Sequence, residues 1–129
     1  MKNNKIFWLV PILILLSLLL AACGSAKDTN FPTGKFIKSG TTDYGLVFNE
    51  DGTFTVFDGA TTLVNGTYSV KDNVYTETSN NGGCKTNVSF NYAFDGKNLT
   101  FTYAGNPNDD VACDGRHTDF NNVTYILSK

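Results

Sequence analysis

Several residue types are rare in this sequence. It contains one arginine, one histidine, one tryptophan and three prolines in 129 residues. Because Arg116 is the single arginine and no basic patch is visible in the sequence, we expect no nucleic-acid partner. After residue 22 leucine is scarce, while threonine, asparagine, glycine and aspartate are abundant. That composition favours β-strands joined by tight turns over helices.

The one long hydrophobic run stands at the start of the chain. Lys2 and Lys5 precede an apolar stretch over residues 6–20, which ends in Leu20-Ala21-Ala22-Cys23. A basic start, an apolar centre and small residues at the end are typical of a secretory signal. The final motif resembles the lipobox of bacterial lipoproteins, which implies acylation of Cys23 and cleavage before it. The run is shorter than the roughly 20 residues of a spanning helix.

We therefore expect three segments. Residues 1–22 are a lipoprotein signal peptide, residues 23–30 the lipidated cysteine with a short polar tether, and residues 31–129 one folded domain. Loss of the two leading lysines leaves eight cationic residues against twelve acidic ones. The expected location is the cell envelope, on the extracytoplasmic side of a membrane to which the chain is anchored by lipid.

Two cysteines remain once Cys23 is assigned to the anchor. Cys84 and Cys113 form one pair, which an oxidising compartment favours as a disulfide. The alternative is metal ligation together with His117, but the chain has no close Cys-x-x-Cys pair. We predict the disulfide, with no metal and no cofactor.

Turn signals recur along the chain at a spacing typical of small β-domains. Turns are predicted at 49–52, 58–59, 65–66, 71–73 and 95–98. Between them, β composition or alternation predicts eight strands, at 35–39, 44–49, 53–57, 67–70, 74–78, 88–94, 99–103 and 122–127. The segment 104–119 is the least regular, and no helix is predicted after Cys23.

Eight short strands joined mainly by hairpins predict an all-β domain. Closing the sheet removes exposed edges, so we expect a small antiparallel up-and-down β-barrel, with a β-sandwich as the alternative. The clearest alternation places Val88, Phe90, Tyr92 and Phe94 on one face. Leu99, Phe101 and Tyr103 follow across the predicted hairpin, and we expect the two sets to face the barrel interior.

The pattern resembles the small bacterial lipocalin-like (calycin) lipoproteins. The resemblance is carried by Thr33-Gly34-Lys35-Phe36, residues 46–54, 66–70 and 94–101, and Cys113 with Arg116. Phe36 stands where lipocalins have the tryptophan of Gly-x-Trp. The resemblance implies a small apolar ligand held inside the barrel, and Phe90, Tyr92, Phe101, Tyr103 and Arg116 are its candidate contacts.

Two hypotheses stay open for the role of Arg116. In the first, its guanidinium pairs with a ligand carboxylate. In the second, which the resemblance implies, it packs across the barrel end over Phe36.

Other chemistry has less support. His117 with Asp114 or Asp119 is the one candidate general-base pair, and the chain lacks a Gly-x-Ser-x-Gly elbow, so we expect no enzyme. The aspartates from Asp109 to Asp114 do not meet EF-hand spacing, and we interpret them as a solvated acidic loop rather than a calcium site.

The expected protein is a monomeric, non-enzymatic envelope lipoprotein that binds or carries a small hydrophobic ligand. The alternative is a protein-interaction module, such as an envelope inhibitor or assembly factor, with a solid barrel core. A cavity lined by the inward aromatics favours the carrier. A filled core with an exposed apolar patch favours the module.

Overall fold

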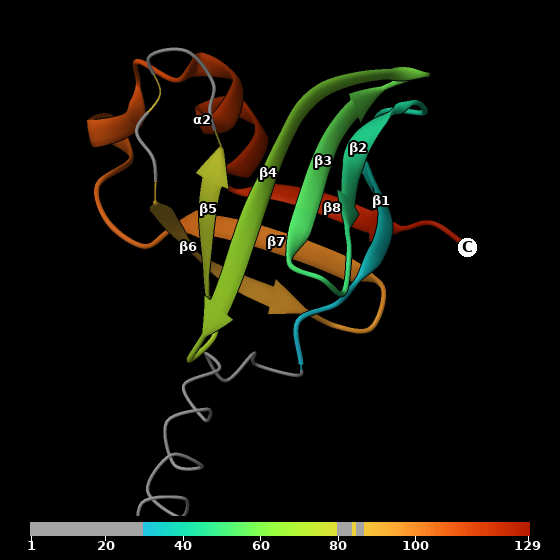
Figure 1. The fold of residues 1–129 in the computed structure, drawn as a ribbon, viewed down its shortest axis with the longest axis horizontal. Helices are drawn as coiled ribbons and strands as arrows, with labels where there is room; N and C mark the ends of the chain where they lie inside the picture. The colour runs from blue at the N-terminus through green and yellow to red at the C-terminus, as the bar shows by residue number, and fades with distance from the viewer. Residues whose placement is uncertain (1–29, 80–83, 85–86) are drawn as a thin grey trace, which may run out of the picture.

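The structure is a computed structural model that describes residues 30–79, 84 and 87–129 (Figure 1). The signal, Cys23 and the tether lie outside the described residues. The elements are β1 (Gly34–Lys38), β2 (Tyr44–Phe48), β3 (Thr53–Asp58), β4 (Thr61–Lys71), β5 (Val74–Ser79), β6 (Val88–Phe94), β7 (Asn98–Tyr103), the 3₁₀-helix η2 (Pro107–Asp110), α2 (Asp114–Phe120) and β8 (Val123–Leu127).

The strands form a closed barrel in which each pairs with the next in the chain. All pairings are antiparallel, and β1 pairs with β8 through Phe36 and Leu127 to close the sheet. The predicted fold class is confirmed: an up-and-down barrel of eight strands, not two sheets of a sandwich. Closure leaves no unpaired sheet edge along these strands.

Local chemistry explains the hairpins. At the β2–β3 turn Gly52 has φ of 85°, and the Asp51 carboxylate accepts the backbone N–H of Thr53 at 2.9 Å. At the β6–β7 turn Asp95 accepts from the backbone N–H groups of Lys97 and Asn98 at 2.9 and 2.7 Å. Short side chains that bond the backbone two or three residues on are the usual turn-forming device.

The predicted turn at Asn65-Gly66 is wrong. Both residues lie inside β4, which is continuous over eleven residues. Gly66 pairs with Phe54 of β3, and a Cβ built there would lie 2.4 Å from the Phe54 ring. The glycine therefore allows close approach of an aromatic ring rather than a reversal of the chain.

The barrel interior is filled by aromatic side chains. Phe31 stacks on Tyr75 at 5.5 Å, and Tyr75 stacks on Phe120 of α2 at 6.0 Å. Phe90 and Phe101 are fully buried beside this column. The core residues are Phe31, Phe36, Leu46, Phe48, Phe54, Val56, Tyr68, Val70, Tyr75, Phe90, Leu99, Phe101, Phe120 and Tyr125. The rings leave the centre of the barrel packed.

The prediction that no helix follows Cys23 is also wrong. The connection between β7 and β8 contains η2 and α2, and Figure 1 shows α2 beside the end of the barrel that β5 points toward. Residues 116, 119 and 120 of α2 are buried, at i, i+3 and i+4, the spacing of one helix face. Two of the three are charged, so the face gives no hydrophobic signal in the sequence. Within the described ranges, no helix is long and apolar enough to cross a membrane.

Candidate functional site

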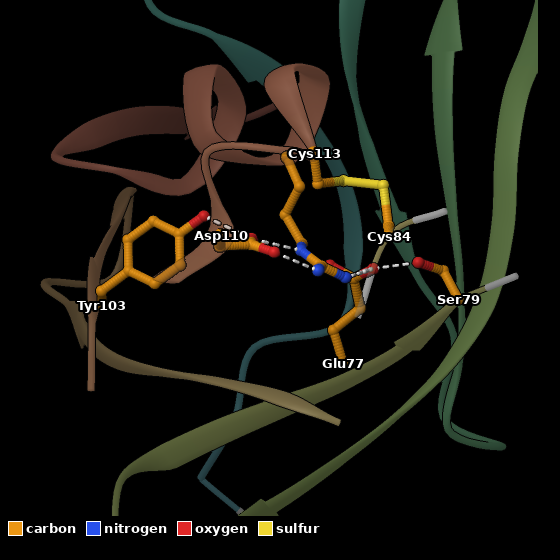
Figure 2. The surroundings of a disulfide bond; sticks show 7 residues. Glu77, Ser79, Cys84, Tyr103, Asp110 and Cys113 are labelled. Atoms are coloured by element: carbon orange, nitrogen blue, oxygen red, sulfur yellow. Dashed lines mark hydrogen bonds and ion pairs between the residues drawn. A yellow bond between two sulfur atoms is a disulfide. The ribbon is translucent and has the colours of Figure 1, made fainter. Parts of the chain in front are cut away.

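A disulfide links the chain after β5 to the start of α2. Cys84 is bonded to Cys113, the residue immediately before the helix (Figure 2). The predicted disulfide is confirmed. In the part of the chain that the structure describes, no group of His, Cys, Asp and Glu residues is arranged to hold a metal ion.

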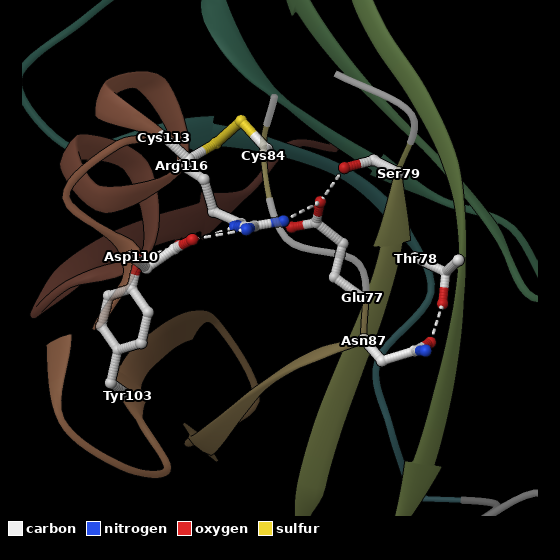
Figure 3. Close-up of polar contacts among 9 residues, drawn as sticks. All are labelled: Glu77, Thr78, Ser79, Cys84, Asn87, Tyr103, Asp110, Cys113 and Arg116. Carbon is white, nitrogen blue, oxygen red and sulfur yellow. Dashed lines mark hydrogen bonds and ion pairs between the residues drawn. A yellow bond between two sulfur atoms is a disulfide. The ribbon is translucent and has the colours of Figure 1, made fainter. Parts of the chain in front are cut away.

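Below the disulfide lies a buried ionic cluster centred on Arg116 (Figure 3). Its Nε and Nη2 donate to the two carboxylate oxygens of Asp110 at 2.7 and 2.6 Å, a bidentate pair. Its Nη1 donates to Oε1 of Glu77 at 3.4 Å. The Tyr103 hydroxyl donates to Asp110 at 2.7 Å, and the Ser79 hydroxyl donates to Glu77. The cluster ties η2 and α2 to β5 and β7.

Arg116 faces the two carboxylates of this cluster, Glu77 and Asp110, and their pKa values shift in opposite directions. Burial raises the pKa of the Glu77 carboxyl, more than Ser79 and Arg116 lower it. Burial acts the same way on Asp110, but hydrogen bonds from Arg116 and Tyr103 outweigh it, so the pKa of Asp110 lies below its usual value. Asp110 is therefore the principal counter-ion of Arg116.

A second cluster fastens the other side of α2. Asp119 is paired with Nζ of Lys38 at 3.1 Å and accepts a hydrogen bond from the Tyr44 hydroxyl. Burial, then the bond to Asp119, raises the pKa of Tyr44. The hydroxyl of Tyr125 donates to the backbone carbonyl of Asp119 at 2.9 Å. These contacts connect α2 to β1, β2 and β8, so the helix is held against the barrel from both sides.

Between α2 and the β3–β4 wall lies a pocket of about 330 Å³. It is lined by Tyr44, Phe54, Val56, Leu63, Val64, Glu77, Cys84, Ala112, Cys113, Asp114, Gly115, Arg116, Asp119 and Phe120. A broader open depression continues over the β1–β2 loop and shares Tyr44, Asp114 and Asp119 with it. The pocket and the depression together form the mouth of the barrel. The pocket volume is at the low end of the range for small-molecule sites.

The predicted ligand contacts are not brought together at one cavity. Phe90 and Phe101 are packed in the core, and Tyr92 and Tyr103 are half-buried against it. None of these four lines the pocket, whereas Arg116 does. Their role as ligand contacts remains a prediction, but the space at the mouth is built from other residues.

Arg116 has partners within the protein, and its pairing with a ligand carboxylate stays a prediction. Its hydrogen bonds go to protein carboxylates, with Asp110 as the main one.

The interpretation of the acidic loop as solvated is wrong for Asp110. This residue is buried as the counter-ion of Arg116, whereas Asp109 and Asp114 are exposed. His117 lies with its ring 5.6 Å from that of Tyr103. Among the described residues, no side-chain hydrogen bond joins it to Asp114 or Asp119, the partners considered for a general base.

Sequence reasoning missed Glu77 and Ser79. Both point inward from β5, since Tyr75, Glu77 and Ser79 share the buried face of that strand. Strict alternation along residues 74–79 was the available signal, because it places a carboxylate two residues from a core tyrosine. A carboxylate on a core-facing position needs a buried partner or a ligand.

Comparisons with protein-family models, with curated proteins and with solved structures found no match to this chain. The closed eight-stranded barrel is consistent with a lipocalin-like fold, as the sequence resemblance implied. Because the fold hosts many functions, the function is argued from the mouth.

Proposed function

We propose that this protein is a non-enzymatic envelope lipoprotein that binds a small, largely apolar molecule at the barrel mouth. The observation that carries the proposal is the pocket of about 330 Å³ between α2 and the β3–β4 wall. Most of its lining side chains are apolar and a few are polar or charged, the composition expected of a ligand site. Because aromatic side chains fill the interior, we place the ligand at the mouth and not in the lumen.

Binding of a neutral apolar fluorophore tests the proposal. N-phenylnaphthylamine should show a saturable rise in fluorescence with the purified protein. Ala112 is exposed and lines the pocket, so Ala112→Trp should fill it and weaken the probe's affinity about tenfold or more.

Val111→Trp is the matched control. Val111 is the neighbouring residue, is 58% exposed and does not line the pocket. This variant should bind the probe like the wild type. Equal weakening in both variants, or the absence of saturable binding by the wild type, rejects the mouth as a ligand site.

A protein-interaction module is the second candidate. Its support is the packed interior together with two exposed large apolar side chains, Leu63 at 51% and Val111 at 58%. Leu63 lies in β4 and lines the pocket, and Val111 lies between η2 and α2, next to the pocket residue Ala112. A wild-type protein that binds no probe would leave this candidate standing.

The anchoring part of the proposal predicts that Cys23 carries acyl chains. Cys23→Ser should leave the membrane fraction and lose metabolic labelling by radioactive palmitate. Equal labelling of wild type and variant would contradict the assignment.

A further inference from the structure

The pocket is lined by two chemically different sets of side chains. The apolar set comes from β3, β4 and α2 and contains Phe54, Val56, Leu63, Val64 and Phe120. The polar set contains the carboxylates of Glu77, Asp114 and Asp119 and one cation, Arg116. A molecule that fills the pocket must combine an apolar body with a polar group that faces an excess of carboxylates.

The cations at the mouth already have counter-charges. Arg116 is paired bidentately with Asp110 and more distantly with Glu77. Lys38, in the adjoining depression, is paired with Asp119 at 3.1 Å. An incoming anion would therefore meet two neutralised cations and the remaining carboxylates, an electrostatically unfavourable environment.

Glu77 has unused acceptor capacity inside the pocket. Its side chain is only 3% exposed, and both hydrogen bonds that it accepts, from Ser79 and Arg116, end on Oε1. Its Oε2 has no hydrogen-bond partner among the residues that the structure describes. A carboxylate oxygen with a vacant acceptor position forms its strongest hydrogen bonds with a cationic donor.

The rim adds charge of the same sign. Asp114 is exposed, lines both the pocket and the depression, and makes no side-chain hydrogen bond or ion pair within the described ranges. Asp43 and Asp58 line the depression. The mouth therefore carries five carboxylates against two cations, a field that attracts positively charged molecules.

We propose that the mouth selects amphipathic cations: small apolar molecules with a protonated amine that donates to Oε2 of Glu77 while the apolar body lies against β3 and β4. This inference rests on the proposed function, because it names the chemical class of ligand for the same pocket. The single arginine of the sequence suggests an anionic ligand, whereas this inference names a cationic one.

Three indole compounds of similar size separate charge from apolar contact. Tryptamine is a cation, tryptophol is neutral and indolepropionate is an anion. Isothermal titration calorimetry with the purified protein should give tryptamine an affinity about tenfold or more above that of tryptophol, the effect of one charge-assisted hydrogen bond. Indolepropionate should bind more weakly than tryptophol.

Glu77→Gln should bring tryptamine down to the affinity of tryptophol and leave tryptophol unchanged. Should that variant fail to fold, Asp114→Asn provides an independent test, since Asp114 is exposed. It should weaken tryptamine about two- to threefold at low salt, with tryptophol unaffected. Asp72→Asn, an exposed charge removal at the β4–β5 turn, is the matched control and should change neither affinity.

Each outcome is decisive. Equal affinity for tryptamine and tryptophol overturns the charge selection and leaves the proposed function intact. Tightest binding of indolepropionate overturns it in favour of Arg116 as an anion receptor. A tryptamine preference that survives both Glu77→Gln and Asp114→Asn rejects the assigned contacts. Binding of none of the three compounds rejects both the inference and the pocket as a ligand site.

Discussion

Replacing Asp110 with asparagine should lower the free energy of unfolding by about 3–5 kcal/mol, the usual cost of breaking a buried ion pair. Arg116 is 5% exposed and Asp110 is 4% exposed. In the variant the guanidinium would keep only the 3.4 Å contact with Glu77 as a charged partner. Urea unfolding, with the disulfide intact, measures the change.

Two matched variants isolate the effect. Asp109→Asn makes the same chemical change at the exposed neighbour on η2 and should alter stability by about 0.5 kcal/mol or less. Glu77→Gln should cost about 1 kcal/mol or less, because the Arg116–Asp110 pair stays intact and the amide oxygen still accepts hydrogen bonds. If Asp110→Asn costs no more than Asp109→Asn, the cluster does not hold the helix.

The pH dependence of these two variants should differ in sign. The pKa of Asp110 is lowered in the folded protein, so its stabilisation is present above its usual value of 3.8 and is lost as the pH falls below it. The deficit of Asp110→Asn should therefore shrink in acid. The pKa of Glu77 is raised, so the wild type loses stability as the pH rises above 4.5, and Glu77→Gln should gain relative to it.

Truncating Phe90 to alanine should cost about 3–5 kcal/mol, because the ring fills the packed interior. Phe90 is fully buried, with ring centroids 4.7 Å from Tyr103 and 4.9 Å from Phe120. The loss should appear in urea unfolding, with little change in the affinity of a ligand bound at the mouth. A small loss of stability with a large loss of affinity would instead place the ligand in the lumen.

Two further variants serve as controls for the interior. Phe94→Ala removes a half-buried ring at the edge of the core and should cost less than Phe90→Ala. Tyr75→Phe removes a buried hydroxyl that has no hydrogen-bond partner among the described residues, so it should be neutral or stabilise by about 1 kcal/mol. Destabilisation by Tyr75→Phe would indicate a polar partner for that hydroxyl inside the barrel.

Several features of this protein are local enough to be predicted from its sequence. The hairpins at Gly52 and Gly96 follow from turn chemistry within four residues. Alternation along residues 88–103 predicts which side chains point inward, and Phe90 and Phe101 are fully buried as expected. Closure follows from the same pattern, since eight short antiparallel strands in a small domain leave few other ways to satisfy their edges.

Tertiary structure alone decided where the site lies. The helix α2 is short, and its inward face is built from Arg116, Asp119 and Phe120, so hydrophobic periodicity does not reveal it. Arg116 is buried against Asp110, six residues away, and Glu77, 39 residues away. Asp119 is buried against Lys38 and the hydroxyl of Tyr44, which lie 81 and 75 residues away. Whether the lumen is hollow depends on how aromatic rings from several strands and α2 interdigitate in three dimensions, which no single strand encodes. The packed interior therefore leaves the pocket at the mouth.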